Sequence, residues 1–406
     1  MLRCGLLGKK LGHSYSPQIH TRMGDYGYRL FEKSEEELPE FLRSGPWDAL
    51  NVTIPYKKAV LPYCTSLSEA ARKTGSVNTL VRLPEGGLFG DNTDVGGFLA
   101  TVLSSGLELR GEKCLVFGSG GASAAVCAAL DALGAEAVVV SRRGENNYSD
   151  LSRHREAAFA VNATPLGMYP ENGVSPVDLG LFPRCRGVFD LIYNPARTAF
   201  LLQAEALGIP GFGGLQMLVA QAAKSSEDFT GKVIPEERVR EIEKELRRET
   251  ENIVLIGMPG CGKSTVAALL GKAAGREVLD ADALIAEQAG RSIPEIFSAE
   301  GEEGFRRWET EVLRELGKLS GKVIATGGGC VTREENYPLL HQNGRIFWLR
   351  RDLEKLPREG RPLSQAGDLR EMARVREPLY RRFADESIDN NFSPEETVRR
   401  ILEGMA

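Results

Sequence analysis

The sequence predicts an α/β protein in which mostly parallel strands are wound by helices. Residues 113–143 and 252–275 carry this prediction, because each stretch reads as a strand, a glycine-rich turn and a helix. Parallel strands need such crossover connections, and strands alternating with helices are typical of α/β folds. The 406 residues exceed one ordinary domain, so we expect at least two compact units.

Composition excludes several classes of function. Hydrophobic residues at 42% and charged residues at 26% are ordinary for a globular enzyme, and the net charge of -5 argues against a nucleic-acid partner. No stretch approaches 18 apolar residues and the N-terminus lacks signal-peptide features, so we expect no membrane partner. The 7 cysteines are scattered without a CxxC pair, which favours reduced thiols and a cytoplasmic location. The 4 histidines show no zinc-ligand spacing.

A charged stretch at residues 235–252 marks the boundary between the two halves of the chain. Its apolar residues Val239, Ile242 and Leu246 recur at helical spacing, which predicts a helix lying on the first domain. The linker itself is then short, at about residues 248–251, and a new strand follows it.

The sequence GMPGCGKST at residues 257–265 follows an apolar strand and precedes a helical run. In that context the glycines expose backbone N–H groups to phosphate oxygens, the lysine reaches the β- and γ-phosphates, and the serine hydroxyl ligates magnesium. The residues expected to bind ATP are Gly257, Gly260, Cys261, Gly262, Lys263, Ser264 and Thr265.

Three later segments narrow the choice of phosphoryl acceptor. Asp280 and Asp282 lie two residues apart at a strand end, so one can hold magnesium beside Ser264 while the other orients an acceptor hydroxyl. Arg306 and Glu309 share a helical face, which suits either an anionic substrate or a surface ion pair. Three glycines then end a strand and allow the backbone to approach a ligand closely: Gly327, Gly328 and Gly329.

In this order, GMPGCGKST, LDAD, GEEGFRRWE, TGGG, GRPLS and REPLYRR resemble shikimate kinase over residues 252–406. The resemblance implies a P-loop fold, MgATP, and Asp282 as the base facing the substrate's 3-hydroxyl. It also implies an adenine contact at Arg358 and a lid arginine at Arg361, although the segment before Arg361 is shorter than usual in this family. The substrate contacts it implies are Asp282, Arg306, Gly327, Gly328, Gly329 and Arg376.

The earlier glycine turn, GSGGAS at residues 118–123, predicts a dinucleotide-binding fold because it joins an apolar strand to an amphipathic helix. The next strand ends in Ser141, Arg142 and Arg143, where an NAD enzyme would carry an acidic residue. Arginines there favour a 2'-phosphate and hence NADP, with a solvated pair as the alternative. The turn residues expected to contact the cofactor are Gly118, Ser119, Gly120, Gly121 and Ala122.

Polar residues before this turn suggest an acid-binding pocket. Ser14 and Ser16 precede a proline at a predicted helix start, and Asp94 opens another predicted helix. Helix capping is the alternative for all three residues. In NVTIPYKK, Pro55 predicts a helix start, which would place Lys57 at the positive end of a helix dipole. A structural cation is disfavoured there, so we interpret Lys57 as a proton carrier. Lys58 would point about 100° further round the same helix, and we interpret it as a solvated charge.

The series GHSYSP, NVTIPYK, GSVNT, GDNTDVGG, GSGGAS, NATPLGM, DLIYNP and GLQMLVAQA resembles shikimate dehydrogenase along residues 1–248. The resemblance implies catalysis by Lys57 and Asp94, and a substrate lobe of residues 1–96 and 212–248 around an inserted Rossmann NADP lobe of residues 97–211. The substrate contacts that it implies are Ser14, Ser16, Asn51, Thr53, Lys57, Asn78, Asp94, Tyr193 and Gln221. The further cofactor contacts are Asn162, Thr164 and Gly214.

The segment at residues 144–158 has room for one helix only, so we expect the cofactor lobe to lack an edge element of the family. Together the two resemblances predict a bifunctional enzyme of aromatic precursor synthesis. It would reduce 3-dehydroshikimate with NADPH and then phosphorylate the resulting shikimate with MgATP. The alternatives are a degenerate half that only binds a ligand or regulates, and an NAD-dependent quinate/shikimate dehydrogenase. Nothing in the sequence indicates the oligomeric state.

Overall fold

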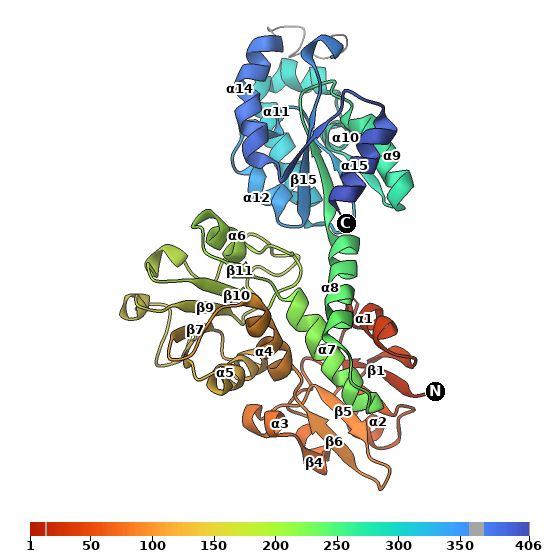
Figure 1. The fold of residues 1–406 in the computed structure, drawn as a ribbon, viewed down its shortest axis with the longest axis vertical. Coiled ribbons are helices and arrows are strands. Elements are labelled where there is room, and N and C mark those ends of the chain that lie inside the picture. The colour runs from red at the N-terminus through yellow and green to blue at the C-terminus, as the bar shows by residue number, and fades with distance from the viewer. Residues whose placement is uncertain (13, 357–368, 406) are drawn as a thin grey trace. The chain divides into compact units, whose positions relative to one another are not determined.

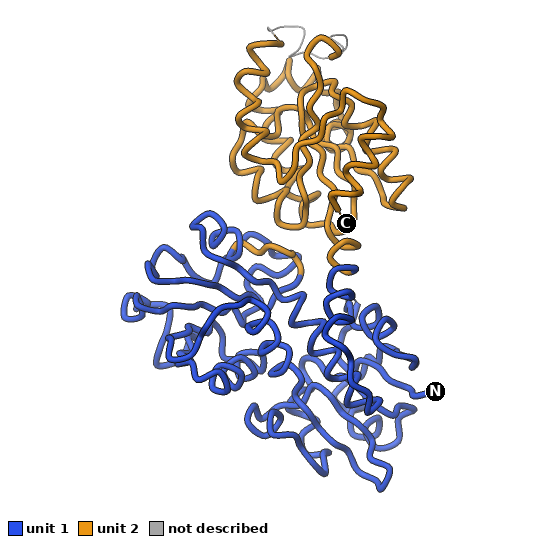
Figure 2. The backbone as a smooth tube through the Cα atoms, viewed as in Figure 1, with its two compact units in different colours: residues 1–193, 200–245 blue, residues 194–199, 246–406 orange. Residues whose placement is uncertain are grey.

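The computed structural model describes residues 1–12, 14–356 and 369–405. The chain forms two compact units, which Figure 2 colours separately. Unit 1 comprises residues 1–193 and 200–245, and unit 2 comprises residues 194–199 and 246–406. Among the helices described, none combines the length and the apolar character needed to cross a bilayer. The α/β class predicted from the sequence is confirmed, because each unit is built from sheets covered by helices (Figure 1).

The first sheet of unit 1 has the strand order β2-β1-β3-β5-β6-β4. It is mixed rather than parallel, because β5 runs antiparallel to both β3 and β6. The prediction of mostly parallel strands holds in this sheet for β1 with β2 and β3 and for β4 with β6, but not for β5. Its strands are β1 (Arg3–Gly8), β2 (Gly27–Glu32), β3 (Ala49–Val52), β4 (Ser66–Leu67), β5 (Thr79–Arg82) and β6 (Leu88–Asp91). The helices before the second sheet are α1 (Ser16–Met23), α2 (Leu38–Ser44), α3 (Glu69–Thr74) and α4 (Asp94–Ser105).

The second sheet of unit 1 is parallel, with the order β11-β10-β9-β7-β8. Its strands are β7 (Lys113–Phe117), β8 (Glu136–Val140), β9 (Phe159–Asn162), β10 (Gly187–Asp190) and β11 (Gly211–Phe212). Helices α5 (Gly121–Ala132) and α6 (Ala199–Ala206) follow β7 and β10. This is the strand order of a doubly wound sheet, except that among the described residues only an isolated bridge from Val140 to Asn146 lies beyond β8. The strand β8 is therefore an edge strand, as expected from the loss of an edge element. The helix expected in residues 144–158 is only a short 3-10 helix, Leu151–His154.

Alternating side chains of β7 divide the core of this lobe between the two faces of the sheet. Cys114 and Val116 pack in one apolar cluster, whereas Leu115 and Phe117 pack in another. Successive side chains of a strand point to opposite faces, so the unbroken apolar run at residues 114–117 fits a strand that is buried on both sides.

Helix α4 packs against α7 (Leu215–Thr230). Gly97 permits their close approach, because a Cβ there would lie 2.8 Å from the Met217 carbonyl oxygen and 2.9 Å from Cβ of Gln221. Asp94 stands at the first residue of α4, and Gln221 lies one turn further along α7 than Met217. The helix pair therefore brings residues from distant parts of the chain close to the end of β6.

Helix α8 (Glu236–Thr250) confirms the helix predicted at the boundary between the halves. Its Arg238 donates to the carbonyl oxygen of Arg22 in α1 at 3.1 Å, and Ile242 is fully buried. The linker expected at about residues 248–251 is not a loop, because α8 continues to Thr250 and the next strand begins at Asn252. A helix with a continuous apolar stripe has no physical reason to end at the domain boundary.

Unit 2 contains a parallel sheet with the order β13-β14-β12-β15-β16. Its strands are β12 (Asn252–Ile256), β13 (Val278–Asp280), β14 (Val323–Ala325), β15 (Gly344–Arg350) and β16 (Glu386–Asp389). Helices α9 and α15 cover one face, and α11, α12 and α14 cover the other (Figure 1). The helices are α9 (Lys263–Ala274), α10 (Ala281–Ala289), α11 (Ile293–Lys318), α12 (Asn336–His341), α14 (Leu369–Phe383) and α15 (Pro394–Gly404). All five residues of β12 are buried, so the phosphate-loop strand is central.

Candidate functional sites

In unit 1 the structure brings together the two residues predicted to be catalytic. The ammonium Nζ of Lys57 lies 2.6 Å from Oδ2 of Asp94, and both side chains are largely shielded from solvent. The other carboxylate oxygen, Oδ1 of Asp94, accepts a hydrogen bond from Nδ2 of Asn78 at 2.8 Å. An ammonium and a carboxylate held this way can exchange a proton with a bound substrate.

The helix expected to start at Pro55 is absent, so the interpretation of Lys57 through a helix dipole is wrong. Residues 54–60 form successive turns, in which the backbone N–H of Tyr56 donates to Thr53 and that of Val60 donates to Tyr56. Tyr56 and Val60 are buried and anchor the segment. Lys57 faces Asp94 while the neighbouring Lys58 is exposed, so the two lysines lie in different environments, and the role of Lys57 as proton carrier stays a prediction.

Ser14 and Ser16 stand where α1 begins, as predicted, with Ser16 as its first residue. The Ser14 hydroxyl donates to Oγ of Ser16 at 3.1 Å and accepts from the Ser16 backbone at 3.2 Å. Tyr28 connects this turn to β3, because its hydroxyl donates to Oδ1 of Asn51 at 2.8 Å and also bonds to Ser16. Burial raises the pKa of Tyr28 well above its usual range, so the phenol stays a donor.

The remaining predicted substrate contacts lie around this turn. The ring of Tyr193 packs on Tyr15, with centroids 5.2 Å apart, and burial raises the pKa of Tyr193. The half-buried Thr53 follows β3, and its backbone N–H donates to the Leu7 carbonyl at 2.9 Å. On α7, Oε1 of Gln221 accepts from the Thr93 hydroxyl at 3.3 Å. The predicted contacts of unit 1 therefore come from the starts of α1, β5 and α4, from the end of β3, from the segment after β10, and from α7.

The predicted cofactor residues border the ends of β7, β8 and β9. Gly118 has a φ of 113°, and a Cβ there would lie 2.8 Å from the Ala163 carbonyl oxygen, so only glycine fits this turn beside the NATPLG segment. Asn162 shapes that segment, because its Oδ1 accepts from the Thr164 backbone at 3.0 Å and the Thr164 hydroxyl at 2.6 Å.

Around the rest of this turn, backbone and cationic groups face solvent. Gly120 caps α5, and open space surrounds a Cβ placed at Gly120 or Gly121. Ser119 and the two arginines after β8, Arg142 and Arg143, are exposed. The other predicted contacts are the half-buried Gly121, Ala122 and Ser141, and Gly214, which caps α7. Exposed N–H groups beside two arginines suit a phosphorylated ligand.

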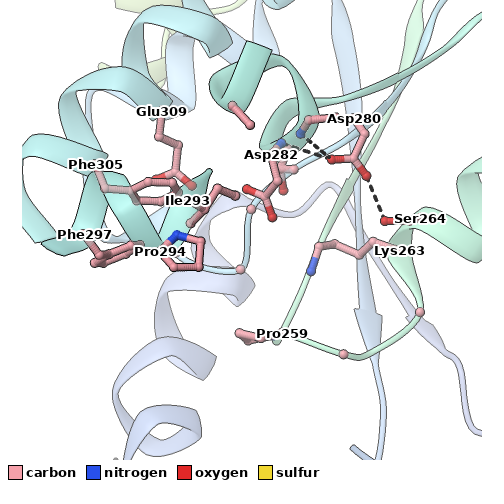
Figure 3. Close-up of a pocket in the computed structure, with 18 of the residues that line it drawn as sticks. Pro259, Lys263, Ser264, Asp280, Asp282, Ile293, Pro294, Phe297, Phe305 and Glu309 are labelled. Carbon is pink, nitrogen blue, oxygen red and sulfur yellow. Dashed lines mark hydrogen bonds between the residues drawn. The ribbon is translucent and has the colours of Figure 1, made fainter. Parts of the chain in front are cut away.

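Unit 2 holds a cavity of about 960 Å³ that is lined by the phosphate loop and α11. The Lys263 ammonium reaches back across this loop to the carbonyl oxygens of Gly257 at 2.9 Å and Met258 at 3.2 Å. Figure 3 shows Lys263, Ser264, Asp280 and Asp282 around this cavity. Of the predicted ATP contacts, Gly260, Gly262, Lys263, Ser264 and Thr265 line the cavity, whereas Gly257 and the buried Cys261 of the same loop do not.

Two predicted metal ligands meet in this cavity. The Ser264 hydroxyl donates to Oδ2 of Asp280 at 2.8 Å, and Oδ1 of Asp280 caps α10 by accepting from the backbone of Asp282 at 3.0 Å (Figure 3). A hydroxyl and a carboxylate present only oxygen atoms, the ligands that Mg²⁺ prefers, and they leave most positions to water and phosphate. These residues therefore fit a hydrated magnesium ion.

Arg306 and Glu309 form a buried pair, so the alternative of a solvated surface pair is wrong. Nη1 of Arg306 lies 2.6 Å from Oε2 of Glu309, and their side chains are 5% and 0% exposed. Burial raises the pKa of Glu309, although the guanidinium opposes this effect. Within the described residues, Nε of Arg306 is buried without a hydrogen-bond partner. Arg306 lines the cavity, and a guanidinium with an unused N–H donor there suits an anionic ligand.

The glycines of TGGG are required by close packing around this arginine. A Cβ at Gly327 would lie 2.5 Å from Oε1 of Glu309 and 2.8 Å from Oδ1 of Asp282, and a Cβ at Gly329 would overlap the guanidinium of Arg306. Nη1 of Arg376 donates to the Gly328 carbonyl at 3.1 Å. The predicted acid-binding residues of the second half therefore line one wall, whereas Arg358 and Arg361 lie outside the described residues.

Sequence reasoning missed several residues of both sites. In unit 2, Phe297 and Phe305 line the cavity with their rings stacked 4.6 Å apart, and Arg351 lines it beyond β15. The apolar spacing on α11 was visible, but an aromatic pair on a helix usually means core packing. In unit 1, the hydroxyls of Thr79, Thr93 and Ser225 surround Asn51 and Asn78, and no local pattern marks them.

Two family models match the chain. Residues 6–80 match the shikimate dehydrogenase substrate binding domain, and residues 259–406 match shikimate kinase. A "Shikimate dehydrogenase (NADP(+))" from Caldanaerobacter subterraneus subsp. tengcongensis is 34% identical over 265 residues, which span 58% of this chain and 94% of that relative.

Solved structures agree with this assignment. A chorismate mutase/shikimate 5-dehydrogenase fusion protein from Clostridium acetobutylicum aligns with a TM-score of 0.57 and 39% identity, over 60% of this chain and 96% of that one. Shikimate 5-dehydrogenase from Thermus thermophilus, solved with NADP(H) and shikimate, aligns with a TM-score of 0.55 and 34% identity, over 60% of this chain and 99% of that one. Through its first part the chain belongs to the shikimate dehydrogenase family, and with the shikimate kinase domain that follows it is a bifunctional enzyme of the shikimate pathway.

Proposed function

We propose that the first part of the chain reduces 3-dehydroshikimate to shikimate with NADPH, and that the second part phosphorylates the shikimate 3-hydroxyl with MgATP. The observation that carries the reductase proposal is the ion pair of Lys57 and Asp94, at 2.6 Å, beside the other predicted acid contacts. NADPH, when bound, supplies the hydride that reduces the ketone carbon. Lys57 donates a proton to the ketone oxygen as the alkoxide develops, and Asp94 orients the ammonium.

The substrate carboxylate is proposed to bind the turn of Ser14 and Ser16, where hydroxyls and the start of α1 supply donors. The ring hydroxyls would be held by Thr53, Asn78, Tyr193 and Gln221, with Asn51 beside them. These side chains present both donors and acceptors, as a small hydroxylated acid requires. Their convergence from separate parts of the chain supports one compact substrate site in the first part of the chain.

NADP preference is proposed from Arg142 and Arg143, which are exposed beyond β8 where an adenosine ribose would lie. Two guanidinium groups favour a ribose 2'-phosphate, whereas an NAD enzyme places a carboxylate there. The relative from Caldanaerobacter and the structure from Thermus thermophilus carry NADP(+) or NADP(H) in their names, which supports the same choice.

A cofactor titration tests this preference and the NAD-dependent alternative together. We expect 3-dehydroshikimate reduction at much lower concentrations of NADPH than of NADH. Joint Arg142→Ala and Arg143→Ala substitution should raise KM for NADPH by about tenfold or more, because charge-assisted contacts to the phosphate are lost. KM for NADH should change little. The control is Arg184→Ala, an exposed arginine elsewhere in the same lobe. Equal use of NADH and NADPH by the unaltered protein would refute the preference.

For the kinase, we propose that Lys263 and the loop amides hold the phosphates, that Ser264 and Asp280 hold Mg²⁺, and that Asp282 is the base at the acceptor hydroxyl. Magnesium, when bound, neutralises charge on the transferring phosphoryl group. Arg306, Arg376 and the glycines of TGGG would bind shikimate, which the buried unpaired donor of Arg306 supports. The roles of Arg358 in adenine binding and Arg361 in lid closure stay predictions from the sequence.

The proposed domain limits are residues 1–248 for the dehydrogenase, with lobes of 1–96 and 212–248 around 97–211, and residues 252–406 for the kinase. The partners proposed are the small-molecule substrates 3-dehydroshikimate and shikimate, with no nucleic-acid and no membrane partner. We also propose a cytoplasmic location. All 7 cysteines are free thiols, which is typical of proteins in a reducing compartment.

A further inference from the structure

Several buried hydroxyl and amide side chains form a hydrogen-bonded network next to Asn78, the residue that donates to Asp94. Its centre is Ser225 on α7, whose side chain is fully buried. Oγ of Ser225 lies 2.8 Å from Nδ2 of Asn51, 2.9 Å from Oγ1 of Thr79 and 3.0 Å from Oγ1 of Thr93. The serine hydroxyl also donates to the Gln221 carbonyl oxygen at 3.0 Å. One side chain of α7 therefore meets three others that come from β3, β5 and the end of β6.

The direction of two of these hydrogen bonds is determined by partner groups that can act in one way only. Nδ2 of Asn51 is a donor and the Gln221 carbonyl is an acceptor, so Ser225 accepts from the first and donates to the second. Its remaining lone pair faces the hydroxyls of Thr79 and Thr93. Fully satisfied networks of this kind hold a single arrangement of side chains, because each alternative leaves a buried polar group unpaired.

The same two threonines, Thr79 and Thr93, also contact the side chain of Asn78. Oδ1 of Asn78 accepts from the Thr93 backbone at 2.8 Å and lies 3.1 Å from the hydroxyl oxygens of Thr93 and Thr79, each of which has one proton to give to this oxygen or to Ser225. The backbone N–H of Thr93 can only donate, so it excludes a flipped carboxamide, which would turn an NH₂ group toward it. Nδ2 of Asn78 is therefore held toward Asp94, to which it donates at 2.8 Å.

We propose that Ser225 is a positioning residue of the dehydrogenase reaction: its hydroxyl orders Asn51, Thr79 and Thr93, and through Asn78 it fixes the Asp94 carboxylate opposite Lys57. The inference rests on the proposed catalytic roles of Lys57 and Asp94. Ser225 touches neither residue, so it acts only through the network. Loss of its hydroxyl leaves the buried amide nitrogen Nδ2 of Asn51 with longer contacts only, to Thr79 at 3.3 Å and the Asn78 carbonyl at 3.5 Å.

The test compares Ser225→Ala with Ser226→Ala in the full chain. Ser226 is the next residue of α7 and is also buried, but its hydroxyl faces Tyr26. We expect Ser225→Ala to lower kcat for 3-dehydroshikimate reduction about tenfold, which corresponds to one lost buried hydrogen bond. The pH dependence of kcat should also shift, while KM for NADPH and the kinase rate stay unchanged. Ser226→Ala should retain the kcat and pH profile of the unaltered protein.

A purely structural role for Ser225 would lower the melting temperature of both variants and leave both pH profiles in place, which would overturn the proposal. A double-mutant cycle adds a second readout, with Thr93→Val as an isosteric removal of the neighbouring hydroxyl. If both groups act on Asn78, the loss in the double variant will be smaller than the product of the two single losses. Independent, multiplicative losses would contradict the shared network.

Lys57→Ala, assayed in parallel, separates failure of this inference from failure of the proposed function. If Lys57→Ala loses reductase activity but Ser225→Ala keeps the kcat and pH profile of Ser226→Ala, the proposed role of Ser225 is wrong. The catalytic assignment of Lys57 then remains in place. Full activity of Lys57→Ala would remove both.

Discussion

Replacement of Lys263 by alanine is expected to lower the kcat of shikimate phosphorylation by about a thousandfold, while the rate of 3-dehydroshikimate reduction stays the same. In the structure the Lys263 ammonium is buried and held by two loop carbonyls at the edge of the cavity. An ammonium placed there stabilises the charge that moves between the phosphates, and alanine removes it without a substitute. The measurement is the steady-state rate of each activity on the same preparation.

Lys272→Ala is the matched control, because Lys272 lies on the same helix, α9, and is exposed. The control should keep both activities. A parallel fall of both activities in Lys263→Ala would point to general misfolding rather than to lost phosphate binding. Unchanged phosphorylation would contradict the proposed role of the phosphate loop.

Replacement of Lys57 by alanine is expected to have the opposite selectivity. Reduction of 3-dehydroshikimate should fall by about a thousandfold, because general acid catalysis by a positioned group contributes roughly 10²- to 10⁴-fold. Phosphorylation of shikimate should be unaffected, because Lys57 belongs to unit 1 and the kinase cavity belongs to unit 2. Initial rates of NADPH oxidation, measured across pH, check the result.

Lys58→Ala provides the adjacent control, since Lys58 is exposed while Lys57 faces Asp94. It should change reduction by less than about twofold, as substitutions of exposed charges usually do. Similar losses in the two lysine variants would show that the proton carrier has been misassigned.

The parts of the fold that the sequence predicts well are those governed by local chemistry. The apolar run of β7 followed by glycine and an amphipathic helix leaves few alternatives, because Gly118 must adopt a positive φ beside the Ala163 carbonyl. The phosphate loop between β12 and α9 is predictable for the same reason. In both places the pattern of residues contains the physical cause of the structure.

Tertiary packing explains where the sequence predictions fail. Pro55 is compatible with a helix start, but buried Tyr56, whose hydroxyl donates to the Lys33 carbonyl at 2.5 Å, holds residues 54–60 in turns. In residues 144–158, the Asn147 side chain accepts from the Ser149 backbone at 3.0 Å, and such local bonds favour turns over a full helix.

Ser225 illustrates the limit of sequence reasoning at the site itself. Its hydrogen bond to Asn51 spans 174 positions of the chain, and a serine on the buried side of a helix gives no local sign of such a partner. Lys57 and Asp94, 37 positions apart, are identified by their motifs, but only the structure gives the 2.6 Å contact between them.

The most direct test of the account is a single coupled assay on the full chain. The unaltered protein is supplied with 3-dehydroshikimate, NADPH and MgATP, and shikimate 3-phosphate is measured by mass spectrometry against NADPH consumed. The account predicts that the unaltered protein forms shikimate 3-phosphate and that Lys263→Ala accumulates shikimate. Lys57→Ala should form shikimate 3-phosphate about a thousandfold more slowly from 3-dehydroshikimate, but at the normal rate from added shikimate. Oxidation of NADPH without any phosphorylated product, or no oxidation at all, would contradict it and show that one half only binds a ligand or regulates the other.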